Sequence, residues 1–295
     1  MVKIKEHKIT PYTNLQYANL RDAYLRCANL RYADLGYANL RDADLRYADL
    51  EYANLRYANL SSADLRDTDL SNAYLRYANL RDADLRYANL QYTTLIDADL
   101  ESANLEHADL EYADLRYANL SNADLRDTDL SNADLRYANL RDADLRYANL
   151  RDADLRYADL EYADLRYANL SNANLVDADL RDADLRYANL NNTFLPHFQI
   201  CPSEGSFVGW KKTTGGVVKL LIPEEAERTS TLAGRKCRAS HVVVLDGEGY
   251  SKFSPYKAEY RPGETVYADK YNGDIRIICT NGIHFFMTKQ EAEKW

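Results

Sequence analysis

A leucine stands at every fifth position along most of this chain, with small and polar residues between. From Leu15 to Leu195 the register never breaks, which gives 37 leucines. Two residues before each leucine stands Ala or, at a few positions, Thr, and most leucines directly follow Asp or Asn. A period of five fits neither a helix, in which successive leucines would point in different directions, nor a flat strand, in which an odd step changes face. The leucines therefore share one interior only if the backbone turns a corner every five residues.

Four such corners close a square coil of 20 residues. Asp and Asn suit the corners because their side chains bond nearby backbone groups. Coils stacked at the spacing of β-strands, ~4.8 Å, predict a solenoid roughly 43 Å long over residues 13–195. Leu would fill its lumen, and Ala would stand where a larger side chain does not fit. We expect residues 1–12 to cap one end, and Phe194, Phe198 and Ile200 to cap the other.

The quintets ANLRY and ADLRD, with their variants along 13–195, resemble the A-(D/N)-L-x-x motif of the pentapeptide-repeat family. The resemblance implies a right-handed quadrilateral β-helix. Some members of the family resemble duplex DNA in shape and charge and bind DNA gyrase, whereas most have no assigned activity.

The charge of the repeats bears on DNA mimicry. Between residues 11 and 195 there are 20 basic residues, all Arg, and 33 acidic residues, a net charge of −13. Over the expected length this is about one net charge per ~3.3 Å, whereas duplex DNA carries one per ~1.7 Å. A DNA-mimicking ligand of DNA gyrase or another topoisomerase is therefore the alternative, and protein binding in general is the first interpretation. Stacked Asp, Arg and Tyr would also form a solvated surface that supports itself.

One coil departs from this mixture of charges. The stretch IDADLESANLEHADLEYADL, from Ile96 to Leu115, contains seven acidic residues and no Lys or Arg. We call its carboxylates the acidic belt and predict that they bind a basic partner. Drift within a duplicated array would produce the same composition, and the near-identity of the repeats fits recent duplication or consensus design equally well. The acidic belt consists of Asp97, Asp99, Glu101, Glu106, Asp109, Glu111 and Asp114.

The composition changes after Leu195, where Gly, Pro, Lys and Phe return. We expect a linker over 196–205 and a small β-rich domain over 206–295. Its strands are predicted at SFVGW, GVVKLLI, SHVVVL, ETVYA, IRIICT and GIHFFM, and Thr288 opens a capping-box pattern for a short closing helix. The stretches FVGWKK, LLIPEEAER, AGRKCRASHVVVL and GIHFFMTKQEAE resemble an uncharacterised domain that follows pentapeptide repeats in phage and bacterial proteins. That resemblance brings no catalytic residues. The β-helix and the β-rich domain together predict an all-β fold class.

Two Cys and two His of this domain could form a tetrahedral zinc site. Buried Cys is also common in core strands without any chemical role. The segments SHVVVL and IRIICT, which include His241 and Cys279, look like core strands. A thiol with an imidazole base is a further alternative, although nothing in the sequence supplies a third group. The candidate metal ligands are Cys237, His241, Cys279 and His284.

A modest basic patch is the remaining feature of this domain. An ordinary solvated edge of the domain would account for it. It consists of Lys211, Lys212, Arg235, Lys236 and Arg238.

Other classes of protein find no support in the sequence. No apolar run reaches the ~20 residues that cross a bilayer. MVKIKEHKIT lacks a secretory apolar segment, and four cysteines are too few for a disulfide framework. GWKKTTGG lacks the spacing of a phosphate-binding loop. We therefore expect a cytoplasmic protein without cofactor, enzymatic activity, direct nucleic-acid binding or membrane binding. Its partner would be a protein, with DNA gyrase as one candidate, and a symmetric homodimer is compatible with the sequence.

Overall fold

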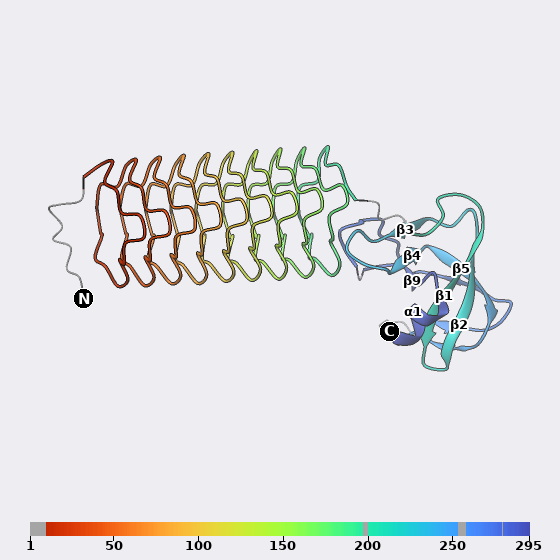
Figure 1. Cartoon of the computed structure of the whole chain (residues 1–295). Coiled ribbons are helices and arrows are strands. Elements are labelled where there is room, and N and C mark those ends of the chain that lie inside the picture. The colour runs from red at the N-terminus through yellow and green to blue at the C-terminus, as the bar shows by residue number, and fades with distance from the viewer. Residues whose placement is uncertain (1–9, 197–199, 253–257, 279) are drawn as a thin grey trace. The chain divides into compact units, whose positions relative to one another are not determined.

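The computed structural model describes residues 10–196, 200–252, 258–278 and 280–295. It contains two compact units, residues 1–197 and 198–295. The first is the stack of coils drawn from red to green in Figure 1, and the second contains the helix and the longer strands. In the described part of the chain, no helix has the length and apolarity needed to cross a membrane.

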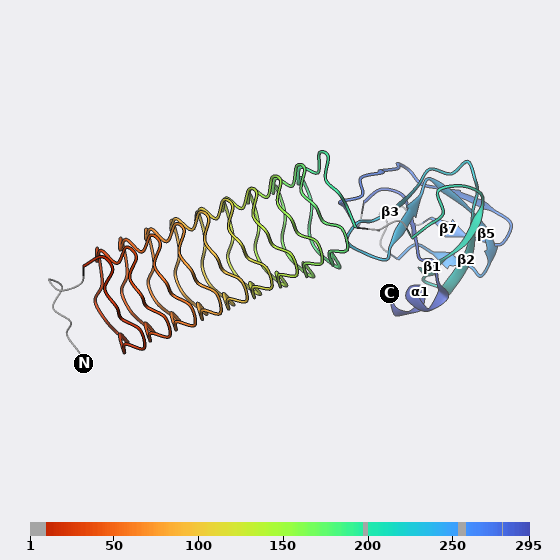
Figure 2. The same ribbon diagram turned by 45° about the horizontal axis from the view of Figure 1, so that its top comes forward.

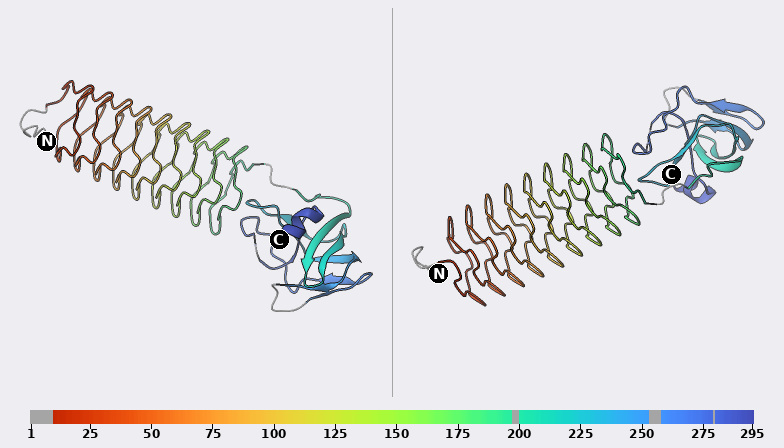
Figure 3. Two further views of the ribbon diagram at one scale, coloured as in Figure 1. Left: turned by 60° about the horizontal axis from the view of Figure 1, so that its bottom comes forward. Right: turned by 90° about the horizontal axis from the view of Figure 1, so that it is seen from above.

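The repeats form the predicted four-sided β-helix. From Asn14 to Asn174, each residue before a leucine pairs in parallel with the residue 20 positions later, as Asp84 does with Asn104. The backbone bonds follow the same step: Leu105 N–H donates to the carbonyl of Asp124 at 2.7 Å, and Asp124 N–H donates to that of Ala103 at 3.0 Å. Successive coils therefore lie in register, and their corners align in rows (Figures 2 and 3).

The corners combine an Asx turn with a left-handed residue. Where Asp or Asn precedes a leucine, its side chain accepts a hydrogen bond from the N–H two residues later, as the Asn59 Oδ1 does from Ser61 at 3.1 Å. This is the local bonding that favours Asp and Asn in turns. Two residues after each leucine from Leu15 to Leu190, φ lies between 55° and 64°, although none of these residues is Gly. The hydrogen bonds between coils therefore hold these corners in a backbone conformation that residues other than Gly rarely adopt.

The lumen is filled by leucine and alanine. From Leu30 to Leu175 every repeat leucine is at most 1% exposed, and the alanines between them are as deeply buried. Between Leu30 and Leu175 three lumen positions hold Thr instead of Ala, and each Thr hydroxyl donates to the carbonyl of the preceding leucine, as in Thr68 to Leu65 at 2.6 Å. The polar group is thus satisfied inside the core.

The predicted cap at the C-terminal end of the coils is wrong for its two described residues. Phe194 stands directly before a leucine, where every side chain points outward, and it is 63% exposed. Ile200 packs against the core of the second unit instead. Phe198, the third predicted cap residue, and residues 1–9 of the predicted N-terminal cap lie outside the described residues.

The second unit consists of small antiparallel sheets. One has the strand order β1-β2-β5-β8, another has β3-β4-β9, and β6 pairs with β7. The strands are β1 Phe207–Thr213, β2 Gly216–Ile222, β3 Arg228–Ser230, β4 Cys237–Ala239, β5 His241–Asp246, β6 Gly249–Tyr250, β7 Glu259–Tyr260, β8 Thr265–Tyr267 and β9 Ile283–Phe285. The predicted closing helix is confirmed as α1, Lys289–Lys294, with both bonds of the capping box between Thr288 and Glu291.

The core of this unit includes residues of the predicted linker 196–205. Cys201 is buried, and the backbone N–H groups of Ile200 and Cys201 donate to the Ser230 hydroxyl at 3.0 and 3.1 Å. Gly209 lets β1 cross the core closely, because a Cβ there would lie 2.6 Å from the ring of Phe285. The chain therefore enters the second unit before residue 206.

The strand predicted at IRIICT, residues 275–280, is not formed by its described residues. The Asp274 Oδ1 accepts from Arg276 N–H at 3.0 Å, and the Asp274 carbonyl accepts from Ile277 N–H. These bonds close a turn, so local bonding by Asp overrides the β preference of the isoleucines.

Candidate functional site

Stacked tyrosines cover much of the β-helix surface. They occupy the left-handed corner positions, so rings 20 residues apart lie face to face. Tyr17, Tyr37 and Tyr57 are stacked with centroids 5.1 and 4.7 Å apart. The coil of the acidic belt interrupts this ladder with Asp97, and a second ladder starts at Tyr117. Exposed aromatic ladders present contact area whose side-chain entropy has already been lost in folding.

Arginine neutralises most of the carboxylate ladders within the fold. Two hydrogen bonds join the Arg46 guanidinium to Asp44, at 2.8 and 2.6 Å, and Arg46 also lies 3.2 Å from Asp64 in the next coil. The hydrogen bonds from Arg46 lower the pKa of the Asp44 carboxyl. The same pairing recurs along this face, so the carboxylate charge is offset coil by coil. The predicted self-supporting surface thus accounts for these residues.

The acidic belt receives arginines from the coils before and after it. Five of its seven carboxylates form such pairs. Arg81 pairs with both Asp99 and Glu101, and Arg126 lies 3.2 Å from Glu106. The other two pairs are Arg76 with Asp97 at 3.5 Å and Arg116 with Asp114 at 2.7 Å.

Two belt carboxylates, Asp109 and Glu111, form no ion pair with a described residue. The Gln91 side chain amide donates to them at 2.7 and 3.5 Å. Tyr92 and Tyr112 follow in the same corners, with stacked rings 5.0 Å apart and exposed fractions of 55% and 46%. We call these five residues the tyrosine–carboxylate patch. It combines uncompensated negative charge with exposed aromatic surface.

Among the described residues of the β-helix, three groups of carboxylates, one of them with a histidine, are close enough to surround a cation. In each group at least one carboxylate already binds arginine: Arg31 pairs with Glu51, Arg126 with Glu106, and both Arg141 and Arg181 with the buried Glu161. These groups therefore serve ion pairs of the fold. They are Asp49, Glu51 and Asp69; Glu106, His107 and Asp127; and Asp159, Glu161 and Asp179.

The predicted zinc ligands of the second unit do not come together in the described residues. Cys237 pairs across strands with Phe285, whereas His284 pairs with Arg238. Because neighbouring residues of a strand point to opposite faces, Cys237 and His284 lie on opposite faces of this sheet. His241, on β5, stacks on Tyr267 with centroids 5.2 Å apart. Cys279 lies outside the described residues.

Cys237 instead lies beside Cys201, a contact that the sequence did not indicate. The Ser230 hydroxyl is 3.2 Å from the Cys201 sulfur and 3.8 Å from that of Cys237. The hydrogen bond with Cys237 lowers the pKa of the Cys201 thiol, and the same bond together with burial raises the pKa of Cys237. Both cysteines belong to the core, so packing accounts for them.

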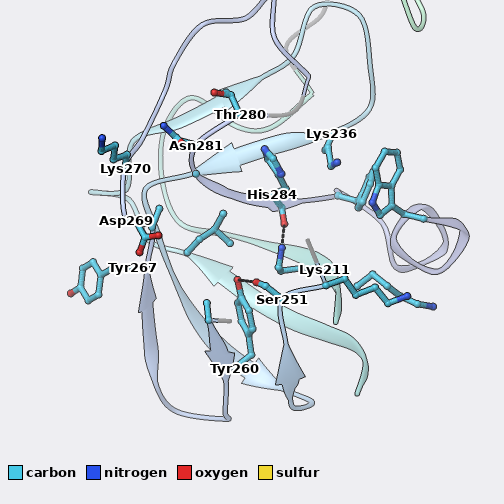
Figure 4. Close-up of a pocket in the computed structure, with 18 residues that line it drawn as sticks. Lys211, Lys236, Ser251, Tyr260, Tyr267, Asp269, Lys270, Thr280, Asn281 and His284 are labelled. Carbon is cyan, nitrogen blue, oxygen red and sulfur yellow. Dashed lines mark hydrogen bonds between the residues drawn. The ribbon is translucent and has the colours of Figure 1, made fainter. Parts of the chain in front are cut away.

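The second unit also contains a cavity of about 820 Å³ with a basic lining (Figure 4). It brings together Lys211, Lys212 and Lys236 of the predicted basic patch, and adds lysines that are distant in sequence. The arginines of that patch have other contacts: Arg235 pairs with Glu291 at 2.7 Å, and Arg238 is buried and donates to backbone carbonyls.

Comparison with known families divides the chain at the same place as the structure. A family model described as pentapeptide repeats (8 copies) matches residues 12–197 through overlapping segments. A second model, described as a family of unknown function (DUF5758), matches residues 197–292. No protein with curated annotation is significantly similar to the chain.

Several solved structures are similar to the repeats. HetL, a pentapeptide repeat protein of Nostoc sp. strain PCC 7120 involved in the regulation of heterocyst differentiation, is 38% identical over 63% of this chain and 88% of its own, with a TM-score of 0.39. A pentapeptide repeat protein of the Arabidopsis thaliana thylakoid lumen is 34% identical over 35% of this chain and 71% of its own, with a TM-score of 0.34. QnrB1, a plasmid-mediated fluoroquinolone resistance protein, is 16% identical over 61% and 89%, with a TM-score of 0.29.

Proposed function

Since this chain belongs to the pentapeptide-repeat family over residues 12–197, we propose that it is a non-enzymatic scaffold that binds a protein partner on the outer surface of its β-helix. The hydrogen bonds between coils fix the outward-facing side chains before any partner arrives. Binding to such a preformed surface costs little ordering entropy. The β-helix therefore presents a preformed surface on which a partner can bind.

The observation that carries this proposal is the tyrosine–carboxylate patch. Tyr is enriched in protein interfaces, because its ring supplies apolar area and its hydroxyl supplies a hydrogen bond. Asp109 and Glu111 add negative charge that forms no ion pair with any described residue. A partner that presents Lys or Arg to the carboxylates and an apolar side chain to Tyr92 and Tyr112 would fit this surface.

DNA gyrase is the alternative partner, bound through mimicry of duplex DNA. Mimicry would use the charge of the whole β-helix, because DNA-binding surfaces contact many phosphates. The pairing of Arg46 with Asp44, repeated from coil to coil, weakens that charge. The two proposals thus differ in where the binding energy lies: in one patch, or along the whole β-helix.

Removing the two uncompensated charges is expected to weaken partner binding about tenfold, or about 1.4 kcal/mol. The variant Asp109→Asn with Glu111→Gln keeps the corner, because Asn precedes leucine elsewhere in the repeats, as at Asn104. The partner is first captured from bacterial lysate on the full chain and identified by mass spectrometry. Calorimetric titration then gives its dissociation constant for each variant.

The matched control is Asp99→Asn with Glu101→Gln. It makes the same two changes in the same coil, but at carboxylates that pair with Arg81. We expect it to change the dissociation constant less than threefold, within the small range typical of exposed ion pairs. Equal weakening by both variants would mean that net charge alone binds the partner. If full-length protein inhibits purified gyrase and both variants inhibit equally, mimicry is the correct account.

A further inference from the structure

The cavity of the second unit has the size and position of a small-molecule site. Its volume of about 820 Å³ lies within the ~300–1,000 Å³ typical of ligand pockets, and far exceeds the space that one inorganic phosphate needs. Segments distant in sequence converge on it: the end of β1, the region of β7, the segment after β8, and β9. This cavity has no role in the proposed function of the β-helix.

The charge of the cavity lining is strongly unbalanced. Five lysines line it, and the only acidic side chain among the described lining residues is that of Asp269, which is exposed. Like charges gathered around one cavity repel one another and raise the local concentration of anions. The lysines are Lys211, Lys212, Lys236, Lys252 and Lys270.

Lys211 lies at the centre of this arrangement (Figure 4). Its ammonium donates one hydrogen bond to the carbonyl oxygen of His284, at 3.2 Å, and lies 5.7 Å from the ring centroid of Tyr260. It forms no ion pair with a carboxylate of the described residues. An ammonium has three N–H donors, so two remain for a ligand.

Burial makes the charge of Lys211 costly in the absence of a ligand. Burial, followed by the charge of Lys236, lowers the pKa of Lys211 to about 8. A charged group withdrawn from water without an opposite charge destabilises the fold. An anion bound in the cavity would offset that cost, which favours a binding role for Lys211 over a structural one.

Lys236 provides the second fixed cation. It is only 6% exposed, and its ammonium lies 3.7 Å from the ring centroid of Trp295. This cation–π contact holds the side chain in place without reducing its positive charge. Two largely buried ammonium groups thus line the same cavity.

The remaining lining suits the uncharged part of a ligand. Burial, with the charges of Lys236 and Lys211, lowers the pKa of His284 to about 3, so its ring is neutral at physiological pH. Tyr260 and Ser251 contribute hydroxyl groups 3.5 Å apart at the lower wall in Figure 4. Phe286 and Trp295 add apolar surface.

We propose that this cavity binds a small organic phosphate, a molecule with a phosphate monoester or diphosphate group on an organic body. The phosphate oxygens would accept hydrogen bonds from Lys211 and Lys236, and the organic body would lie against the aromatic residues. Phosphate fits better than a single carboxylate because it carries up to two charges and three acceptor oxygens, which match several lysines. A concave site of this volume fits a small molecule better than an extended chain.

Calorimetric titration of the full-length protein tests this proposal. The probes are inorganic pyrophosphate and adenosine diphosphate, with citrate as a polyanion without phosphate. We expect both phosphates to bind and citrate to bind at least about tenfold more weakly. Lys211→Met, which removes the charge and keeps the length, is expected to weaken the binding of both phosphates at least about tenfold.

Lys219→Met is the matched control, because Lys219 lies on β2 over the Trp210 ring, outside the cavity. It should leave the affinity within about twofold. If Lys211→Met does not fold, the exposed Lys270→Met replaces it, with an expected loss of about threefold. The proposal is overturned if neither phosphate binds, if citrate binds equally well, or if the folded cavity variant keeps full affinity. None of these results bears on partner binding by the β-helix.

Discussion

Leu105→Ala is expected to lower the free energy of unfolding of the β-helix by about 2–5 kcal/mol. Leu105 is fully buried in the middle of the lumen, between the coils that contain Leu85 and Leu125. The surrounding backbone is bonded to the coils on both sides, as in Leu105 N–H to the Asp124 carbonyl, so it cannot collapse into the space left by the side chain. The full cost of a cavity should therefore be observed. Urea unfolding followed by circular dichroism measures it.

Leu15→Ala is the control for this prediction. Leu15 occupies the same position of the repeat, but it lies in the first coil and is partly exposed. We expect a loss of less than about 2 kcal/mol, because solvent already reaches the site. Hydrogen exchange should show faster opening around residue 105 in the first variant, and only at the N-terminal end in the second. Equal losses at both positions would contradict a lumen that is packed by successive coils.

Ser62→Val is expected to destabilise the β-helix by about 1–2 kcal/mol, although Ser62 is exposed. Ser62 has a φ of 57°, and the N–H group donates to the carbonyl of Arg81 in the next coil at 2.9 Å. A β-branched side chain clashes with the backbone in this left-handed conformation. To relieve the clash the corner would have to lose its bond to the next coil. Thermal unfolding measures the effect.

The neighbouring variant Ser61→Val isolates this backbone effect. It makes the same chemical change in the same turn, but Ser61 does not have a positive φ. Valine already occupies the equivalent turn position at Val176. We expect a change within about 0.5 kcal/mol, as for ordinary surface substitutions. If the two variants were equally stable, the left-handed corners would not constrain the choice of residue.

The β-helix was predictable from the sequence because one simple constraint determines it. An unbroken period of five leaves only a backbone that turns at every quintet, and the Asp or Asn before most leucines indicates how the turn is bonded. The left-handed conformation two residues after the leucine was harder to predict. Tyr at positions such as Tyr57 carries no signal for positive φ, because this residue seldom adopts it outside a fold that enforces it.

The acidic belt was only partly predictable. Its composition is evident along the chain, but its charge depends on arginines 20 residues away, such as Arg81 beside Glu101. The reach of a long guanidinium side chain decides which carboxylates are neutralised. Asp109 and Glu111 differ from the other five because Gln91, rather than an arginine, occupies the neighbouring coil at their corner.

The second unit shows the limit of prediction from local pattern. The alternating or continuous apolar residues predicted β1, β2 and β5, and the capping box predicted α1. The cavity was not evident, because Lys211, Lys236 and Lys270 are brought together only by the pairing of distant strands. For the same reason the sequence did not show that Cys237 and His284 lie on opposite faces of one sheet.

Direct contact at the tyrosine–carboxylate patch is the central claim, and photo-crosslinking tests it most directly. A photoreactive p-benzoylphenylalanine would replace Tyr112 in the full-length protein, and Tyr162 in a control. Both tyrosines occupy left-handed corners and are comparably exposed, but Tyr162 lies on another face, beside Arg141. We predict that irradiation in bacterial lysate cross-links one protein partner from position 112 and little or none from position 162. Equal yields from the two positions, or no cross-link from position 112, would contradict the proposed binding surface.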